Sequence, residues 1–437
     1  MTLTSVLVTA GVVAASGGMV WLRHLGSGPR PLTVADIVAD APPELRTAVS
    51  ILADPGQTNL MLAALGLGSI DGGFPYVERY DYTAHGLDAE LIMLGGQSLA
   101  DWNDEETLDQ FATYLGVPTV TAVSPEPSWV RLQVRAWDTL AAPSTLPGAV
   151  HNGVDLEAVP VGVTEDYELW RLRVLYGHIL LAGATGSGKG SVLWSIIAAL
   201  GAAILAGLVD VWMADPKGGM EFGRGEPLFV RFATDATTIL AMLRDAVQQM
   251  QERTVRLRAA GVRKHVPTTD EPLIVVIIDE AAALSAYATR EQKAEFEQLL
   301  GLLLSQGRAV GVSVIAALQD PSKETMPSRQ LFPIRIGLRL DEPTQTTMVH
   351  GQGARDRGAL CDKISEHTPG VGYVGEDGST GFVRVRAFHV TDDDIDRLVE
   401  QYAPGANVDL APQGDYSGFD PDDLGDGDTD GDGLVAA

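Results

Sequence analysis

The sequence HILLAGATGSGKGSVLWSIIAAL, residues 178–200, contains an apolar run, a glycine-rich loop, a lysine and a second apolar run. The first run is typical of a buried strand, and the apolar spacing of Ser191–Leu200 predicts a helix. The loop glycines let several backbone N–H groups face one concave surface beside the lysine, as in loops that bind nucleotide phosphates. We expect the following residues to bind the nucleotide: Gly183, Ala184, Thr185, Gly186, Ser187, Gly188, Lys189, Gly190 and Ser191.

The position after Lys189 departs from the usual motif. A Ser or Thr there normally offers its hydroxyl to Mg²⁺, whereas this chain has Gly190 and carries a hydroxyl one residue later, at Ser191. Two alternatives stay open for the metal. Either the first helical turn shifts so that Ser191 binds it, or Thr185, Asp279 and water do so.

Composition limits the class of protein. The length of 437 residues is enough for two or three domains. The hydrophobic fraction of 45% is enough to form a large core. Its single cysteine, Cys361, excludes an internal disulfide and fits a reducing compartment. The net charge of −27 repels phosphates, so any contact with nucleic acid requires a local basic patch.

The N-terminus contains an uncharged apolar stretch. Residues 3–22 are long enough to cross a bilayer as a helix, and Arg23 follows directly. The positive-inside tendency then predicts a single-pass anchor in the cell membrane over residues 1–24, with the bulk of the chain cytoplasmic. A cleaved signal peptide and a loose or interfacial N-terminus are the alternatives.

The rest of the chain divides by composition into four regions. Prolines interrupt residues 25–75, which we interpret as a linker with short helices. Residues 76–150 predict a small α/β module, and residues 151–403 form the domain that contains the phosphate loop. Residues 404–437 carry nine Asp and no Lys or Arg, which predicts a disordered acidic tail.

A pair of acids follows the most apolar segment. Leu273–Ile278 is apolar at every position, which suits a central parallel strand buried on both faces. Asp279 comes next and is placed to hold Mg²⁺, while the adjacent Glu280 is placed to deprotonate an attacking water. This pair favours an ATPase motor over switch GTPases and small-molecule kinases. The alternative for Glu280 is a carboxylate that only stabilises a helix start.

Polar residues also follow two other predicted strands. Val310–Leu318 ends at Gln319, whose amide is placed to sense the γ-phosphate or the water, or else satisfies loop backbone groups. Leu208–Ala214 ends at Asp215–Gly219, where ligands lie in open α/β sheets, although a plain turn is the alternative.

Basic residues occupy two further places. Ile334–Leu340 alternates strictly, which predicts an exposed strand face that carries Arg335 and Arg339. Such arginines suit an arginine finger that reaches a neighbouring subunit, or a surface of salt bridges. The basic cluster from Arg253 to Lys264 we interpret as a solvated helix end.

Taken together, several segments resemble the FtsK/SpoIIIE family, and most of all its Tra-type DNA-transfer ATPases of actinobacterial plasmids. The segments are GATGSGKGSVLWS, DPKGG, LIVVIIDE, LLLSQGRAVGVSVIAALQDP, LFPIRIGLRL and GARDRGALCDKI. The resemblance implies a RecA-like P-loop ATPase fold of the ASCE type. It also implies a homo-hexameric ring that moves double-stranded DNA with ATP and Mg²⁺.

The same resemblance implies roles for individual residues. Lys189 binds phosphate, Asp279 binds the metal and Glu280 activates water. Gln319 couples the ATP state to the DNA loop, and Arg335 aligns with the finger position. Lys323 lies in the channel loop, and with Arg329 it is expected to contact DNA.

The leading hypothesis is therefore a membrane-anchored, ATP-driven translocase of double-stranded DNA. It would serve conjugative or septal DNA transfer together with other DNA-transfer proteins. Two alternatives remain open, a protein-translocating ATPase of the type VII secretion kind and an ATP-gated scaffold at the membrane.

Overall fold

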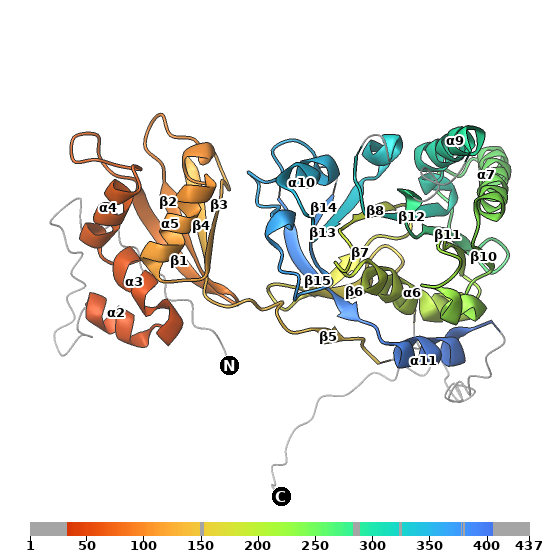
Figure 1. Ribbon diagram of the computed structural model, residues 1–437, viewed down its shortest axis with the longest axis horizontal. Coiled ribbons are helices and arrows are strands. Elements are labelled where there is room, and N and C mark those ends of the chain that lie inside the picture. The colour runs from red at the N-terminus through yellow and green to blue at the C-terminus, as the bar shows by residue number, and fades with distance from the viewer. Residues whose placement is uncertain are drawn as a thin grey trace, which may run out of the picture.

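The described residues of the protein form two bodies, each built on its own β-sheet (Figure 1). The predicted anchor over residues 1–24 lies outside the part of the chain that the structure describes, as does the predicted tail apart from Pro404. Within the described part, every helix is too short or too polar to cross a bilayer. This computed structural model describes residues 33–148, 153–282, 289–322, 326–376, 378 and 381–404.

The N-terminal module contains a four-stranded antiparallel sheet with helices against it. In sheet order its strands are β1 (Tyr76–Thr83), β2 (Gly86–Ile92), β4 (Trp129–Arg135) and β3 (Thr119–Val123). Its helices are α2 (Val34–Asp40), η1 (Pro43–Leu45), α3 (Arg46–Leu52), α4 (Pro55–Ala64), η2 (Leu99–Asp101) and α5 (Glu105–Leu115).

The interpretation of residues 25–75 as a linker differs from what the structure shows. Helices α3 and α4 share one buried core with the sheet, to which they contribute Val49 and Met61. Pro43 and Pro55 each lie in the first turn of a helix. The N–H groups of that turn make no hydrogen bond within the helix, so the N–H that proline lacks is not needed there. The prolines therefore begin these helices instead of breaking them.

The larger domain is built on a mixed sheet in the order β10-β9-β11-β12-β8-β13-β14-β15-β6-β7, with β5 paired to β15. Neighbours are parallel from β10 to β13 and antiparallel from β13 to β7, which confirms an α/β fold with a large parallel sheet. The strands are β5 (Ser144–Thr145), β6 (Val159–Thr164), β7 (Leu169–Leu172), β8 (His178–Ala182), β9 (Val209–Ala214), β10 (Arg231–Ala233), β11 (Leu273–Ile278), β12 (Val312–Leu318), β13 (Ile334–Leu338), β14 (Val371–Glu376) and β15 (Val383–His389).

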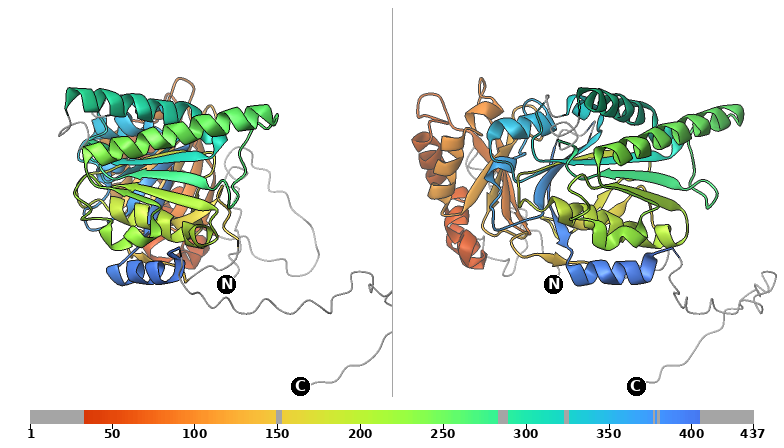
Figure 2. Two further views of the ribbon diagram at one scale, coloured as in Figure 1. Left: turned by 90° about the vertical axis from the view of Figure 1, so that its right-hand side faces the viewer. Right: turned by 45° about the vertical axis from the view of Figure 1, so that its right-hand side comes forward.

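Helices cover both faces of this sheet (Figure 2). Because successive side chains of a strand point to opposite faces, Val275 and Ile277 of β11 pack toward α6 while Val276 and Ile278 pack toward α7 and α9. The prediction that this strand is buried on both faces is confirmed. The helices are α6 (Lys189–Leu205), η3 (Gly223–Leu228), α7 (Ala236–Ala259), α9 (Arg290–Gln306), η4 (Arg308–Val310), η5 (Pro327–Leu331), α10 (Pro343–His350), η6 (Cys361–Lys363) and α11 (Asp392–Tyr402).

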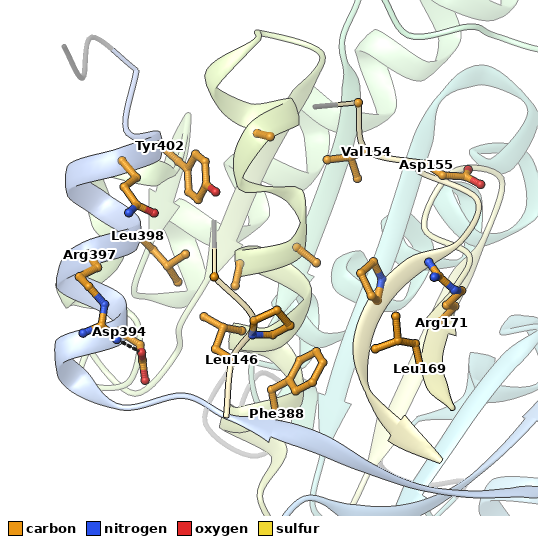
Figure 3. Close-up of a pocket in the computed structure, with 18 of the residues that line it drawn as sticks. Leu146, Val154, Asp155, Leu169, Arg171, Phe388, Asp394, Arg397, Leu398 and Tyr402 are labelled. Atoms are coloured by element: carbon orange, nitrogen blue, oxygen red, sulfur yellow. Dashed lines mark hydrogen bonds and ion pairs between the residues drawn. The ribbon is translucent and has the colours of Figure 1, made fainter. Parts of the chain in front are cut away.

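A cavity of about 500 Å³ lies between α6, α11 and the β6–β7 hairpin (Figure 3). Ala198 of α6, Leu398 and Tyr402 of α11 and Leu169 of β7 line it. None of the phosphate-loop residues 183–188, all of which the structure describes, belongs to its lining. The cavity is therefore separate from the phosphate loop.

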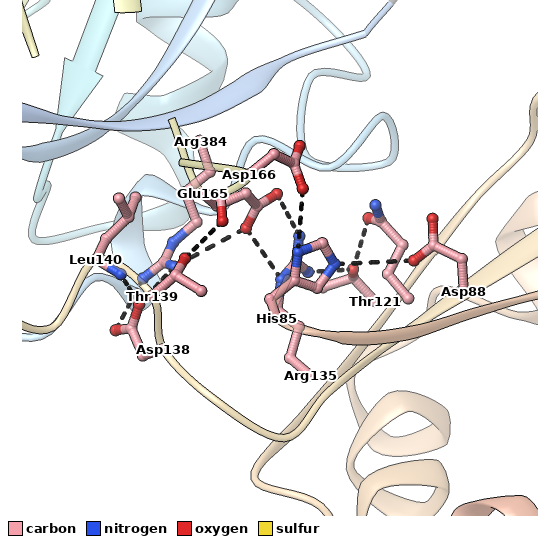
Figure 4. Close-up of polar contacts among 11 residues, drawn as sticks. His85, Asp88, Thr121, Arg135, Asp138, Thr139, Leu140, Glu165, Asp166 and Arg384 are labelled. Carbon is pink, nitrogen blue, oxygen red and sulfur yellow. Dashed lines mark hydrogen bonds and ion pairs between the residues drawn. The ribbon is translucent and has the colours of Figure 1, made fainter. Parts of the chain in front are cut away.

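An ionic network joins the two bodies (Figure 4). Arg135, the last residue of β4, donates from Nε and one terminal nitrogen to both carboxylate oxygens of Glu165, at 3.2 and 2.8 Å. Glu165 follows β6 and is buried. Arg384 of β15 pairs with Asp138 of the connecting segment at 2.8 Å. The module is thus attached to the turn after β6, and Glu105 of α5 also pairs with Lys363 of η6.

The prediction of a solvated basic cluster at the end of α7 is wrong for Arg253, the first residue of the cluster. Arg253 is 3% exposed and donates to the carbonyls of Gly311 (2.9 Å) and Pro272 (2.7 Å), just before β12 and β11 begin. The guanidinium thus donates to the Pro272 carbonyl and adds a second hydrogen bond to the Gly311 carbonyl, which also accepts the N–H of Ile274 at 3.0 Å. Arg256, one turn later, is half exposed and pairs with Glu271.

We expect Arg253→Ala to destabilise the fold by about 2–4 kcal/mol, because it removes the buried charged donor of two backbone carbonyls. Arg256→Ala removes an exposed ion pair and should cost less than about 1 kcal/mol. Thermal unfolding of both variants checks this difference. Equal melting temperatures for the two would contradict the structural role of Arg253.

Candidate nucleotide site

The phosphate loop, residues 183–188, connects β8 to α6 and requires glycine at its end. Gly188 has φ +95°, and a Cβ there would lie 2.2 Å from the backbone nitrogen of Gly370. The loop is also bonded to the sheet, since the Ala184 N–H donates to the carbonyl of Arg339 at 2.8 Å. Its shape therefore depends on β13 and on the segment before β14.

Lys189 begins α6 and turns its ammonium back into the loop. It is 8% exposed, and Nζ donates to the carbonyls of Gly183 (2.7 Å) and Ala184 (3.3 Å). Burial lowers the pKa of Lys189, while the carboxylates of Glu280 and Asp279 oppose this effect. The cation therefore lies at the loop, as the sequence predicts.

The acid pair lies at the same edge of the sheet, because β11 and β8 are both in the parallel half. Asp279 is 3% exposed, and its Oδ2 lies 3.0 Å from Nζ of Lys217. Although burial opposes it, the attraction of Asp279 raises the pKa of Lys217. Lys217 belongs to the DPKGG segment, so this segment is part of the site and not a plain turn.

Glu280 is held in an unusual backbone conformation. Its φ of +56° is uncommon for a residue with a side chain, and such strain is concentrated at functional sites. Oε1 accepts the N–H of Gln319 at 3.2 Å, whereas Oε2 is buried and accepts no hydrogen bond within the described structure. Burial raises the pKa of Glu280, against the Gln319 N–H and the nearby lysines. A carboxylate with one unpaired oxygen and a raised pKa is suited to accept a proton.

Gln319 joins the acid pair to the phosphate loop. The hydroxyl of Thr185 donates to its Oε1 at 3.0 Å, and its N–H reaches Glu280. Arg339, which follows β13, donates to the carbonyl of Thr185 at 2.8 Å and pairs with Asp341 at 3.0 Å. Thr185, Gln319 and Glu280 thus form one connected group.

The sequence missed Asp215 as an organiser of the site. Asp215 follows β9 directly and has no exposed surface, and its carboxylate accepts the N–H groups of Lys217, Glu221 and Phe222 at 3.0–3.1 Å. It therefore shapes the loop that brings Lys217 to Asp279. The only signal in the sequence was the position of an acid at the carboxyl end of a strand.

The two residues that the sequence predicts to contact DNA are Lys323 and Arg329. Arg329 is 8% exposed, and its Nε donates to the carbonyl of Met348 at 3.1 Å. The side chain of Arg329 therefore folds back from η5 onto α10, and its contact with DNA stays a prediction. Lys323 lies outside the described residues.

The strand face that carries Arg335 and Arg339 is not exposed as predicted. Helix α10 covers it, since a Cβ at Gly337 would lie 2.6 Å from Nε2 of His350. Arg335 pairs in register with Leu180 of β8, and its Nε donates to a carbonyl of its own loop. Arg339 instead reaches the phosphate loop within the same chain, so the two arginines have different surroundings.

The donor set fits Mg²⁺ that enters with a nucleotide. Among the described residues, no group of three or more His, Cys, Asp or Glu is placed to hold a metal by itself. Asp279 offers one buried carboxylate beside the phosphate loop, and Mg²⁺ in such sites takes its remaining ligands from phosphates and water. Ser191 lies half-buried on the first turn of α6.

The chain is similar in sequence to a DNA translocase and to a transfer protein, among other relatives. The DNA translocase FtsK of Streptococcus pyogenes serotype M3 (strain SSI-1) is 28% identical over 283 residues, which cover 57% of this chain and 32% of the relative. The chain therefore spans about a third of the length of that protein. The transfer protein TraSA of Streptomyces ambofaciens is 27% identical, over 72% of this chain and 79% of the relative.

A solved structure and a family model agree with these relatives. The pCW3 conjugation coupling protein TcpA, in its monomer form with ATPγS, aligns with 78% of this chain and 97% of that chain. Its TM-score is 0.52 at 21% identity, which shows a shared fold. The model of the FtsK/SpoIIIE family matches residues 156–323. The matched residues include β6, the phosphate loop and β12, and this part of the chain is therefore similar to the FtsK/SpoIIIE family.

Proposed function

We propose that this chain is an ATPase that moves double-stranded DNA for conjugative or septal transfer, as a RecA-like motor in a ring of six copies. One observation carries the proposal: Lys189, Asp279, Glu280 and Gln319 converge at the carboxyl edge of one parallel sheet. A buried cation, a buried acid pair and an amide bonded to the phosphate loop are the parts that phosphoryl transfer to water requires. The names of the two relatives, a DNA translocase and a transfer protein, support DNA as the cargo.

Each residue has a distinct proposed role in hydrolysis. The loop N–H groups and the Lys189 ammonium bind the β- and γ-phosphates. Mg²⁺ would neutralise the phosphate charge, and Asp279 would hold it. Oε2 of Glu280 takes the proton of the attacking water. Gln319 reports the state of the γ-phosphate, because it is bonded to both the loop and the base.

The assembly and the location in the cell belong to the same proposal. Lys323, repeated around a ring, would face the DNA phosphates, which bind without a need to read bases. Arg335 of one copy would reach the nucleotide of the next. Residues 1–24 would anchor the ring in the cell membrane, beside other DNA-transfer proteins, with the bulk of each chain in the cytoplasm.

We expect Lys189→Ala to weaken ATP binding by about 100-fold or more, because it removes a charged donor from the phosphates. Glu280→Gln should keep ATP binding and lower turnover by about 100-fold or more, because it removes the base. Fluorescent nucleotide titration and phosphate release measure the two effects. Normal turnover by the Glu280→Gln protein would remove the catalytic assignment.

Duplex DNA should stimulate the ATPase of protein that lacks residues 1–24. The proposed coupling makes hydrolysis depend on the cargo, so turnover with and without DNA is the direct test. Stimulation by a secreted protein in place of DNA would favour a secretion ATPase of the type VII kind. Turnover that is absent under all conditions would favour an ATP-gated scaffold.

Arg335→Ala should leave ATP binding intact and stop turnover, because its proposed target is the nucleotide of a neighbouring copy. Mixing Arg335→Ala with Lys189→Ala subunits should restore some activity, since each supplies what the other lacks. Arg339→Ala is the contrast: Arg339 contacts its own phosphate loop, so this variant should bind nucleotide more weakly. Absence of rescue in mixed rings would count against a finger in trans.

A further inference from the structure

Gly190, which replaces the usual Ser or Thr after the lysine, faces a carboxylate. A Cβ at Gly190 would lie 2.4 Å from Oε1 of Glu221, which is closer than packed atoms approach. A side chain at residue 190 and the Glu221 carboxylate in this position therefore exclude one another. A carboxylate oxygen of Glu221 thus occupies the space in which the hydroxyl of a Ser or Thr at residue 190 would lie.

The loop that carries Glu221 is fixed on α6 by independent contacts. The buried carboxylate of Asp215 accepts the N–H of Glu221 at 3.0 Å and of Phe222 at 3.1 Å. Phe222 stacks on Trp194 of α6 with ring centroids 5.2 Å apart. Gly225 lies against the same indole, where a Cβ would be 2.2 Å from the ring. The backbone that carries Glu221 is thus fixed beside the start of α6, and the exposed side chain of Glu221 extends from it toward Gly190.

Glu221 also belongs to the charges that surround the nucleotide site. Burial alone would lower the pKa of Lys217, but the carboxylates of Asp279, Glu280 and Glu221 raise this pKa above its ordinary value. The Lys217 ammonium lies 3.0 Å from Asp279, so one cation already interacts with acids from two separate loops. A divalent cation has the same electrostatic preference and binds oxygen ligands.

We propose that the carboxylate of Glu221 is a ligand of the divalent cation that enters with the nucleotide. It takes the part that the hydroxyl after the lysine has in the usual phosphate loop, while Asp279 supplies the second carboxylate. Mg²⁺ in nucleotide sites binds one or two carboxylates together with phosphate oxygens, and this pair fits that rule. The inference rests on the proposed function, because it requires a nucleotide with its metal.

The test is Mn²⁺ binding to the full chain in the presence of ADP, followed by electron paramagnetic resonance. Glu221→Ala should weaken Mn²⁺ binding by about 10-fold or more. Glu226→Ala is the matched control, since Glu226 is an exposed acid five residues later in the same segment, and it should bind Mn²⁺ like wild type. Without metal, the Glu221→Ala protein should bind ADP at least as tightly as wild type, because it lacks a carboxylate that repels phosphates.

A hydroxyl at residue 190 should replace the carboxylate. In the Gly190→Ser, Glu221→Ala double variant the space next to Lys189 is open again, and Mn²⁺ affinity should return toward the wild-type value. Recovery in the double variant, with a loss in Glu221→Ala alone, supports Glu221 as a ligand. Absence of recovery would overturn its assignment as a ligand.

Two other outcomes separate this inference from the proposed function. Wild-type affinity for Mn²⁺ in Glu221→Ala, or an equal loss in Glu226→Ala, would overturn the role of Glu221 while the nucleotide site remains. A wild-type chain that binds neither ADP nor Mn²⁺ with ADP would contradict the proposed function itself, and the assignment of Glu221 would be lost with it.

Discussion

Burial of charge is the constraint on which the nucleotide site depends. Lys189, Asp279 and Glu280 are each less than a tenth exposed, and an isolated ion in such a place costs several kcal/mol. The fold compensates with loop carbonyls for Lys189, an ammonium for Asp279 and a backbone N–H for Glu280. A nucleotide with its metal brings charges of both signs, so its binding would exchange partners within the site. The groups that compensate these buried charges would then also select the ligand.

These charges meet because of the order of the strands. Strand β12 lies between β8 and β11, so Gln319 at its end stands between the phosphate loop and the acid pair. The loop is bonded to the ends of β12 and β13 through the N–H groups of Gly183 and Ala184. The phosphate loop is therefore bonded to strand ends and is not a free loop. Under the proposed function, a change at the γ-phosphate would act on the segments that follow β12 and β13 through these bonds.

The N-terminal module is attached to the larger domain by ion pairs. Its ion pairs reach β15 and the β6–β7 turn, which belong to the antiparallel half of the large sheet. The bidentate pair between Arg135 and Glu165 is geometrically specific, and both side chains are largely buried. The module also reaches the segments before β14, where Lys363 of η6 pairs with Glu105 of α5 and Asn103 donates to the carbonyl of Asp356. The phosphate loop, in contrast, follows β8 in the parallel half of the large sheet.

Much of the site was readable from the sequence, because local patterns determine local structure. An apolar run before a glycine loop and a lysine identified β8, the loop and α6, and the run before Asp279 identified a strand buried on both faces. The α/β class followed from the alternation of such strands with helices. The interpretation failed where one local pattern allows two structures. Prolines both end and begin helices, and an alternating strand does not reveal that α10 will cover its polar face.

The sequence by itself therefore determined the strand, loop and helix that surround Lys189 and the acids that follow β11, since neighbours along the chain create them. Only the tertiary structure decided which distant groups meet them. Lys217 reaches Asp279, Arg339 reaches Thr185, and the Glu221 carboxylate takes the space beside Gly190. Arg253 and Arg329 turn inward to carbonyls for the same reason. The partners of a long charged side chain depend on strand order and loop packing, which spacing along the chain does not specify.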